Sequence, residues 1–140
     1  TFDAFMERDE KARGNRPWLL AATDPVVIPA DTRIRVIVTA ADVLHAWAVP
    51  AFFNKIDAVP GRLNELLISP VAKTGTYYGQ CSELCGVDHS FMPIEVKVVS
   101  KAEYATWVQQ SQRAYPRVGE VRPQSQPNDL AAATRPATKE

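Results

Sequence analysis

Short runs of apolar residues separated by proline and glycine fill the chain from residue 18 to residue 99, and this pattern limits the possible folds most strongly. Alternation with a period of two, or a brief apolar run, predicts strands over residues 26–28, 33–40, 63–69, 74–80 and 93–99. A further strand over residues 43–47 would place His45 at its end. Several short strands with turns between them predict an all-β sandwich or barrel.

A helix is predicted to follow the last strand. Ser100 and Glu103 have the spacing of a capping box, in which the serine side chain accepts from a free backbone N–H and the glutamate reaches back. Tyr104, Trp107 and Val108 then recur at helical spacing, so we expect them to cover one end of the sheet.

Both ends of the chain differ from this middle part. Residues 1–17 are charged and helix-compatible up to Gly14, so we expect an N-terminal helical segment. Residues 116–140 are polar, alanine-rich and interrupted by prolines, which is typical of a flexible or docking tail. The expected organisation is therefore three parts, with the β domain and its C-terminal helix over residues 18–115.

Composition excludes several classes of protein. The 16 basic and 16 acidic residues give a formal net charge of zero, so no nucleic-acid partner is expected. No apolar stretch reaches the roughly 20 residues that a membrane-spanning helix needs. Two cysteines in 140 residues are too few for a disulfide-dense scaffold.

One loop carries most of the possible metal ligands. Cys81, Cys85, His89 and Met92 place two thiols, an imidazole and a thioether within twelve residues. Soft sulfur combined with imidazole favours copper or zinc over magnesium or calcium. The other histidine, His45, lies on a separate predicted strand, as in cupredoxin-type barrels that bring one upstream histidine to such a loop.

Other interpretations of these residues remain open from spacing alone. Cys81 and Cys85 are close enough in sequence to form a disulfide. Together with His45 and His89 they could form a structural Cys₂His₂ zinc site. Met92 or His45, taken individually, would be typical of a packed core residue. The copper interpretation depends on all five occurring together.

Three segments carry a resemblance to a known family. Residues 79–94 resemble the copper loop of cytochrome c oxidase subunit II, with every ligand position filled, and residues 43–50 resemble its upstream histidine segment. Residues 57–62 resemble the segment between them. The resemblance implies a cupredoxin-like Greek-key domain with a CuA centre. Nitrous oxide reductase carries a similar site, but residues 57–62 and Glu83 favour the oxidase.

The resemblance implies a dinuclear copper centre in which Cys81 and Cys85 bridge both coppers through their sulfurs. His45 and His89 would each bind one copper through a ring nitrogen. Rigid thiolates and a charge shared between two metals keep rearrangement on reduction small, and hydrogen bonds behind the imidazoles fix their orientation.

Two weaker ligands complete the implied set. Met92 would bind one copper weakly, and Glu83 would bind the other through its backbone carbonyl. The resemblance also implies that the Glu83 carboxylate reaches a magnesium ion at the border with subunit I.

The implied activity is electron transfer within the terminal oxidase. Reduced cytochrome c would give one electron at a time to the copper pair, which would pass it to the haem of subunit I, where oxygen is reduced. Because cytochrome c is basic, Asp42 and Asp88 are candidates for its docking surface. Trp47 is a candidate for the electron-transfer path or for the docking surface, and equally for a packing role in the core. A mononuclear copper protein or chaperone, and a structural zinc or disulfide domain, are the alternative functions.

The family also suggests where such a domain works. Two transmembrane helices and an aromatic strand normally precede it, and we expect them on a separate N-terminal half of subunit II. The domain would then be a head on the intermembrane-space face of the mitochondrial inner membrane. The alternative location is the periplasmic face of a bacterial plasma membrane.

Overall fold

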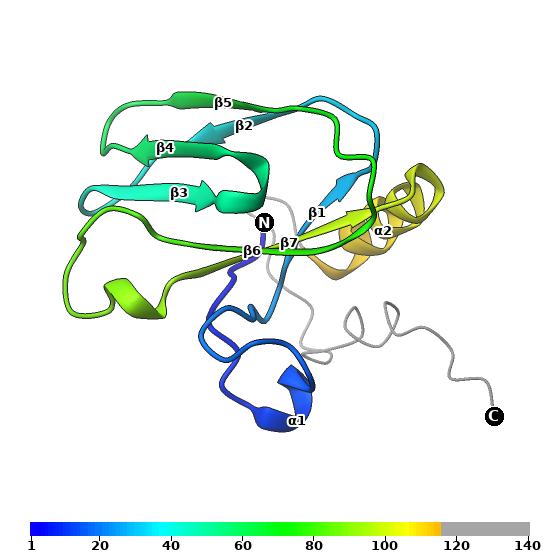
Figure 1. Cartoon of the computed structure of the whole chain (residues 1–140), viewed down its shortest axis with the longest axis horizontal. Coiled ribbons are helices and arrows are strands. Elements are labelled where there is room, and N and C mark those ends of the chain that lie inside the picture. The colour runs from blue at the N-terminus through cyan, green and yellow to red at the C-terminus, as the bar shows by residue number, and fades with distance from the viewer. Residues whose placement is uncertain (116–140) are drawn as a thin grey trace.

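The structure is a computed structural model that describes residues 1–115; the predicted tail lies outside the described residues. Figure 1 shows a β domain with one long helix at its end. In chain order the elements are α1 (Glu10–Arg13), β1 (Val26–Pro29), β2 (Ile34–Val38), β3 (His45–Val49), the 3₁₀ helix η1 (Pro50–Phe52), β4 (Asn54–Ala58), β5 (Asn64–Ile68), β6 (Gly75–Gln80), the 3₁₀ helix η2 (His89–Phe91), β7 (Pro93–Val99) and α2 (Lys101–Ala114).

The strands form two layers, which confirms the predicted all-β class (Figure 1). One layer is the sheet β1–β7–β6, in which β1 runs parallel to β7 and β6 runs antiparallel to it. The other layer contains the antiparallel pairs β2–β5 and β3–β4. The core between the layers includes Ile28, Val49, Val96 and Val98, and Trp47 packs against it.

Two elements differ from the prediction. His45 begins β3 rather than ending a strand over residues 43–47, because residues 41–43 form a bend that leaves Val43 and Leu44 exposed. The alternation did not reveal β4, since Asn54 and Asp57 are poor strand formers. Its pairing with β3 supplies the hydrogen bonds that make it a strand.

Strand β6 approaches β3 so closely that only glycine fits at one position. A Cβ atom on Gly79 would lie 1.9 Å from the carbonyl oxygen of Ala48. Just beyond this contact, the backbone N–H of Ser82 donates to the carbonyl of Ala46 at 3.0 Å. The contact therefore fixes the end of β6, where the cysteine loop begins, against the strand that carries His45.

The predicted C-terminal helix is present with its predicted cap. The Ser100 hydroxyl accepts from the Glu103 backbone N–H at 3.2 Å, and the Glu103 carboxylate accepts from the Ser100 N–H at 2.8 Å. Helix α2 packs beside β1 (Figure 1), and Tyr104, Trp107 and Val108 are half-buried. No helix within residues 1–115 has the length and apolar character required to cross a bilayer.

The N-terminal segment is helical only over Glu10–Arg13, where the Asp9 side chain caps the first turn. The residues before it are extended: the backbone N–H of Glu7 donates to Ala21 at 2.9 Å, and that of Thr23 donates to Phe5 at 2.8 Å. This pairing buries Met6, which a helix with a charged surface would leave exposed. Burial of one apolar side chain thus overrides local helix propensity.

A buried ion pair attaches this segment to the sheet. Glu95 of β7 is 1% exposed, and its Oε2 accepts from the Arg16 guanidinium at 3.0 Å and from the Ala22 backbone N–H at 2.7 Å. Arg16 also donates to the carbonyls of Ala22 and Ala12. A buried carboxylate requires such partners, because an unpaired buried charge is strongly unfavourable.

We predict that Gly79→Ala destabilises the fold by about 2 kcal/mol or more, because the added methyl group meets a backbone oxygen that cannot move aside. Urea denaturation measures the free energy of unfolding. Gly61→Ala is the control, since its positive φ costs about 1–2 kcal/mol but nothing lies within 4 Å of the new Cβ atom. Equal losses for the two variants would contradict the steric explanation.

We predict that Arg16→Met destabilises the fold by about 3 kcal/mol, because it leaves the Glu95 carboxylate buried without its cation. The double variant Arg16→Met/Glu95→Leu should regain part of that loss, since no buried charge remains. A double-mutant cycle in urea measures the coupling. Additive effects of the two substitutions would show that the ion pair does not hold the segment.

Candidate metal centre

The loop over residues 81–92 is closed at its base by the last pairs of a ladder. Gln80 of β6 pairs with Pro93 of β7, and the Cys81 backbone N–H donates to the Met92 carbonyl at 3.1 Å. The first and last predicted ligands of the loop therefore lie side by side. The short helix η2 turns the chain back toward this base after Asp88.

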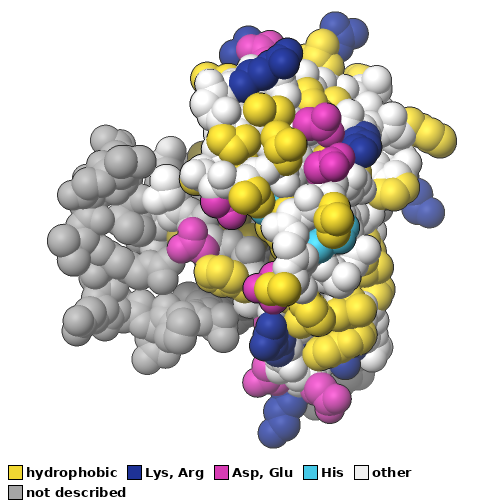
Figure 2. Space-filling view, turned by 90° about the vertical axis from the view of Figure 1, so that its left-hand side faces the viewer, with side chains coloured by type: hydrophobic (Ala, Val, Ile, Leu, Met, Phe, Trp, Pro, Cys, Tyr) yellow, Lys and Arg dark blue, Asp and Glu magenta, His cyan; other side chains and the backbone are white. Residues whose placement is uncertain are grey.

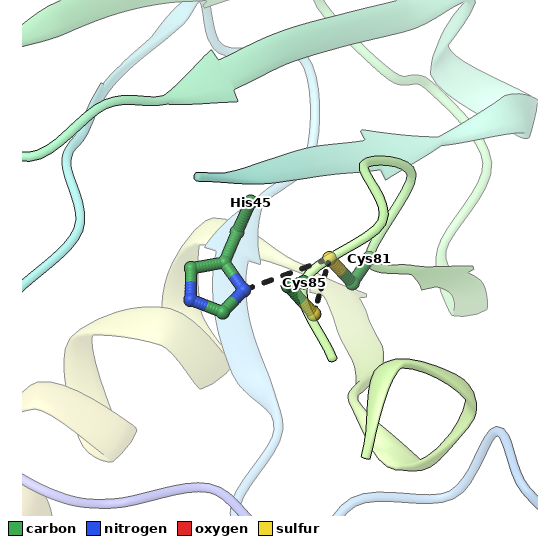
Figure 3. Close-up of side chains that lie close together, drawn as sticks. All are labelled: His45, Cys81 and Cys85. Carbon is green, nitrogen blue, oxygen red and sulfur yellow. Dashed lines mark hydrogen bonds between the residues drawn. The ribbon is translucent and has the colours of Figure 1, made fainter. Parts of the chain in front are cut away.

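Four predicted ligand side chains are linked by a row of successive contacts at this end of the domain. Nδ1 of His45 is 3.8 Å from Sγ of Cys81, which is 3.8 Å from Sγ of Cys85 (Figure 3). Sγ of Cys85 is in turn 3.5 Å from Nδ1 of His89. Both cysteines are free thiols, so the structure does not contain the disulfide that spacing alone allowed.

The two predicted weaker ligands border this row. Sδ of Met92 lies 3.5 Å from Sγ of Cys85, and the Glu83 carbonyl oxygen lies 3.3 Å from Sγ of Cys81. All six residues predicted as ligands are thus within one cluster. The ligand atoms of His45, Cys81 and Cys85 lie within 4.8 Å of one another, which is close enough for shared metal ions.

The surroundings change the acidity of the two thiols in opposite directions. Burial raises the pKa of Cys81, but hydrogen bonding with the backbone at Glu83 and Ala46 and with His45 outweighs it and lowers the pKa to about 6. Burial and the neighbouring Cys81 raise the pKa of Cys85. One thiol is therefore prepared to act as a thiolate, which is the form that binds metals.

His45 has a different partner on each ring nitrogen. Its Nε2 lies 2.9 Å from Oδ1 of Asp42, while its Nδ1 faces Cys81. This hydrogen bond is the main cause that raises the pKa of His45 and lowers that of Asp42. The i, i+3 spacing of the two residues is the sequence signal for this contact, which was not among the predictions.

The predicted docking residues lie in different settings. Asp42 is exposed beside His45, and Asp88 is exposed at the start of η2. Trp47 is half-buried in β3 and packs against the core, so its position agrees with the packing alternative.

Sequence reasoning missed an apolar rim around the cluster. Figure 2 shows a face on which histidine and acidic side chains lie among apolar ones. The rim consists of exposed residues from the bend before β3 and from the loop: Val43, Leu44, Leu84, Val87 and Phe91. Leu84 and Val87 are 79% and 94% exposed. The available signal was that Leu84, Val87 and Phe91 are apolar but lie in a loop outside any predicted strand. An exposed apolar rim of this kind is typical of an interaction surface.

The donor set fits a soft metal ion. Two thiols, two imidazoles and a thioether supply sulfur and nitrogen donors suited to copper or zinc, whereas magnesium and calcium prefer oxygen. The two sulfurs contact each other, and each also contacts an imidazole nitrogen. Sulfur and nitrogen donors from both thiols and both imidazoles are therefore close enough to bind a soft metal together.

The chain is similar in sequence to a known protein family. A family model described as cytochrome c oxidase subunit II, periplasmic domain, matches residues 1–99. Cytochrome c oxidase subunit 2 of Arabidopsis thaliana is 51% identical over 120 residues, which cover 86% of this chain and 45% of that protein. Probable cytochrome c oxidase subunit 2 of Rickettsia bellii is 50% identical over 107 residues, 76% of this chain and 39% of that protein.

Solved structures agree with the sequence relatives. The crystal structure of the periplasmic domain of subunit II of cytochrome oxidase from Bradyrhizobium japonicum superposes with a TM-score of 0.75 at 50% identity, covering 82% of this chain and 79% of that chain. A mixed disulfide intermediate between a thioredoxin-like protein and subunit II of cytochrome c oxidase gives 0.68, also at 50% identity, over 82% and 77% of the two chains.

The chain spans less than half the length of the curated relatives it matches. The sequence match, the shared fold and the ligand row nevertheless coincide over the same residues. The chain therefore belongs to the cytochrome c oxidase subunit II family, over the part that carries the periplasmic domain.

Proposed function

We propose that this domain accepts single electrons from reduced cytochrome c at a dinuclear copper centre and delivers them to the haem of subunit I. The observation that carries the proposal is the row of contacts His45–Cys81–Cys85–His89, in which the two sulfurs contact each other and each contacts an imidazole nitrogen. A mononuclear blue-copper site needs one thiolate, and a second at 3.8 Å would be surplus there.

In this proposal each side chain has a distinct task. Cys81 and Cys85 bridge the two coppers, and His45 and His89 each bind one of them. Bound copper supplies a one-electron store whose charge is shared between two metals. The chain keeps rearrangement small by fixing these donors to β3 and to the base of the β6–β7 ladder before metal binds.

Two further metal contacts belong to the proposal. Met92 acts as a weak ligand, supported by its thioether 3.5 Å from Cys85. The Glu83 carbonyl binds the other copper, supported by its position beside Cys81. The Glu83 side chain is half-buried at this face, and we assign it to a magnesium ion shared with subunit I.

The surface around the ligands has features suited to two protein partners. An apolar rim with acidic residues at its margin suits a basic protein that docks briefly, so Asp42 and Asp88 would steer cytochrome c. Subunit I would cover the side that carries Glu83. The head would then face the intermembrane space or, in a bacterium, the periplasm.

A separate N-terminal half of subunit II stays a prediction, which mass spectrometry of the purified oxidase tests.

Copper loading requires both thiols in the reduced state. One solved relative is a mixed disulfide with a thioredoxin-like protein. Cys81 and Cys85 lie 3.8 Å apart between their sulfurs, close enough to oxidise to a disulfide after a small movement. We propose that a thioredoxin-like reductant keeps this pair open for copper, since thiolates and not disulfides bind metals.

The copper-loaded full chain is predicted to oxidise one equivalent of reduced cytochrome c per copper pair, followed by stopped-flow absorbance of the cytochrome. Cys81→Ser should remove this reaction, because a serine oxygen cannot bridge two coppers as a thiolate does. Ser82→Ala, an exposed neighbour in the same loop, should react like the wild type. Normal electron uptake by Cys81→Ser would contradict the bridging role.

Met92→Leu is predicted to retain the two-copper spectrum and to raise the reduction potential. Met92 would tune the potential without holding the two coppers in place, so the spectrum should survive its loss. Removing its thioether takes away a donor that stabilises the oxidised, more positively charged form, so the potential should rise. Spectroelectrochemistry measures the potential directly. Loss of the two-copper spectrum in Met92→Leu would show that Met92 holds the metals rather than tuning them.

A further inference from the structure

The two ring nitrogens of His45 are held by chemically different groups. Nε2 lies 2.9 Å from Oδ1 of Asp42, and Nδ1 faces Sγ of Cys81 at 3.8 Å. A carboxylate can only accept a hydrogen bond, so Nε2 carries the proton and donates it. The Nδ1 lone pair is therefore directed at the thiol row (Figure 3).

The local backbone makes this contact possible. Residues 41–43 form a bend immediately before β3, and β3 begins at His45 itself. The bend returns Asp42 to the imidazole three residues later, and the His45 side chain is 17% exposed. The Asp42 side chain remains 71% exposed, so the carboxylate is not buried by this contact.

The other histidine has no equivalent support. Within residues 1–115, the contacts found for the His89 ring are with the two thiols, including Nδ1 to Cys85 at 3.5 Å, and no carboxylate is found to accept from its Nε2. Asp88 precedes His89 directly, yet its side chain makes no capping hydrogen bond at η2. The two imidazoles at the ends of the row therefore differ in the group behind them.

We infer that Asp42 is a positioning residue that fixes the ring of His45 with Nδ1 toward the thiolates and makes it the more electron-rich of the two imidazole ligands. The metal part of this inference rests on the proposed function. A carboxylate behind a metal-bound histidine sets its tautomer and raises its basicity, and loss of such a partner typically weakens metal binding about 10–100-fold. A more basic ligand favours the oxidised copper, so Asp42 lowers the reduction potential.

This role differs from docking. A residue that only steers a basic partner changes the association of that partner and its salt dependence, but leaves the isolated domain unchanged. A positioning residue changes the isolated domain itself. Asp42→Ala and Asp88→Ala both remove one exposed negative charge beside a histidine, and only the first removes the hydrogen bond. The pair of variants therefore separates the two roles.

The first arm of the test uses the metal-free full chain. Proton–nitrogen NMR of the histidine rings should show a protected Nε2 proton on His45 in the wild type and in Asp88→Ala. Asp42→Ala should lose that protection, and Asp42→Asn, which keeps an acceptor oxygen, should retain it in part. A protected Nε2 proton that persists in Asp42→Ala would overturn the inference.

The second arm uses the copper-loaded chain. Asp42→Ala should have a higher reduction potential than Asp88→Ala, with Asp42→Asn between Asp42→Ala and the wild type. Equal potentials for Asp42→Ala and Asp88→Ala would overturn the tuning role. A wild-type chain that holds no copper pair would contradict the proposed function instead, and the NMR arm would still decide whether Asp42 orients the ring.

Discussion

The pairing of β6 with β7 is the constraint on which the candidate centre depends. The ladder ends at Gln80 and Pro93, and the next backbone hydrogen bond, from Cys81 to Met92, closes the loop between them. The contact of Ser82 with Ala46 then brings this base against β3, where His45 begins the strand. His45 and Cys81, 36 positions apart, thus meet because two strand ends are fixed. Within the loop itself, the short helix η2 returns the chain to the base.

The fold was predictable where local pattern and tertiary packing agree. Period-two alternation located β2, β5 and β7, and the Ser100–Glu103 capping box located the start of α2. Prediction failed where distant contacts outweigh local preference. The extended N-terminal residues bury Met6 against Ala22, and β4 exists because β3 pairs with it. Glu95 shares a face of β7 with Lys97, so the alternation did not indicate that Glu95 would be buried or that Arg16 would reach it.

The candidate site was likewise predictable from the sequence only in part. Residue types alone indicated which side chains belong together, because both thiols, one of the two imidazoles and one of the two thioethers of the chain occur in one loop. Their contacts in space, in which the two sulfurs meet and each also meets an imidazole nitrogen, are a property of the folded backbone. The support of His45 by Asp42 and the apolar rim around the cluster depend on a bend and a loop, which have no periodicity to detect.

The central claim is that these donors hold two metal ions as one electronic unit. Electron paramagnetic resonance of the copper-loaded full chain, recorded with its visible spectrum and copper content, tests this most directly. We expect two coppers per chain that share one unpaired electron, in a purple protein. A signal from a single copper ion, or a colourless protein with no copper signal, would contradict the account.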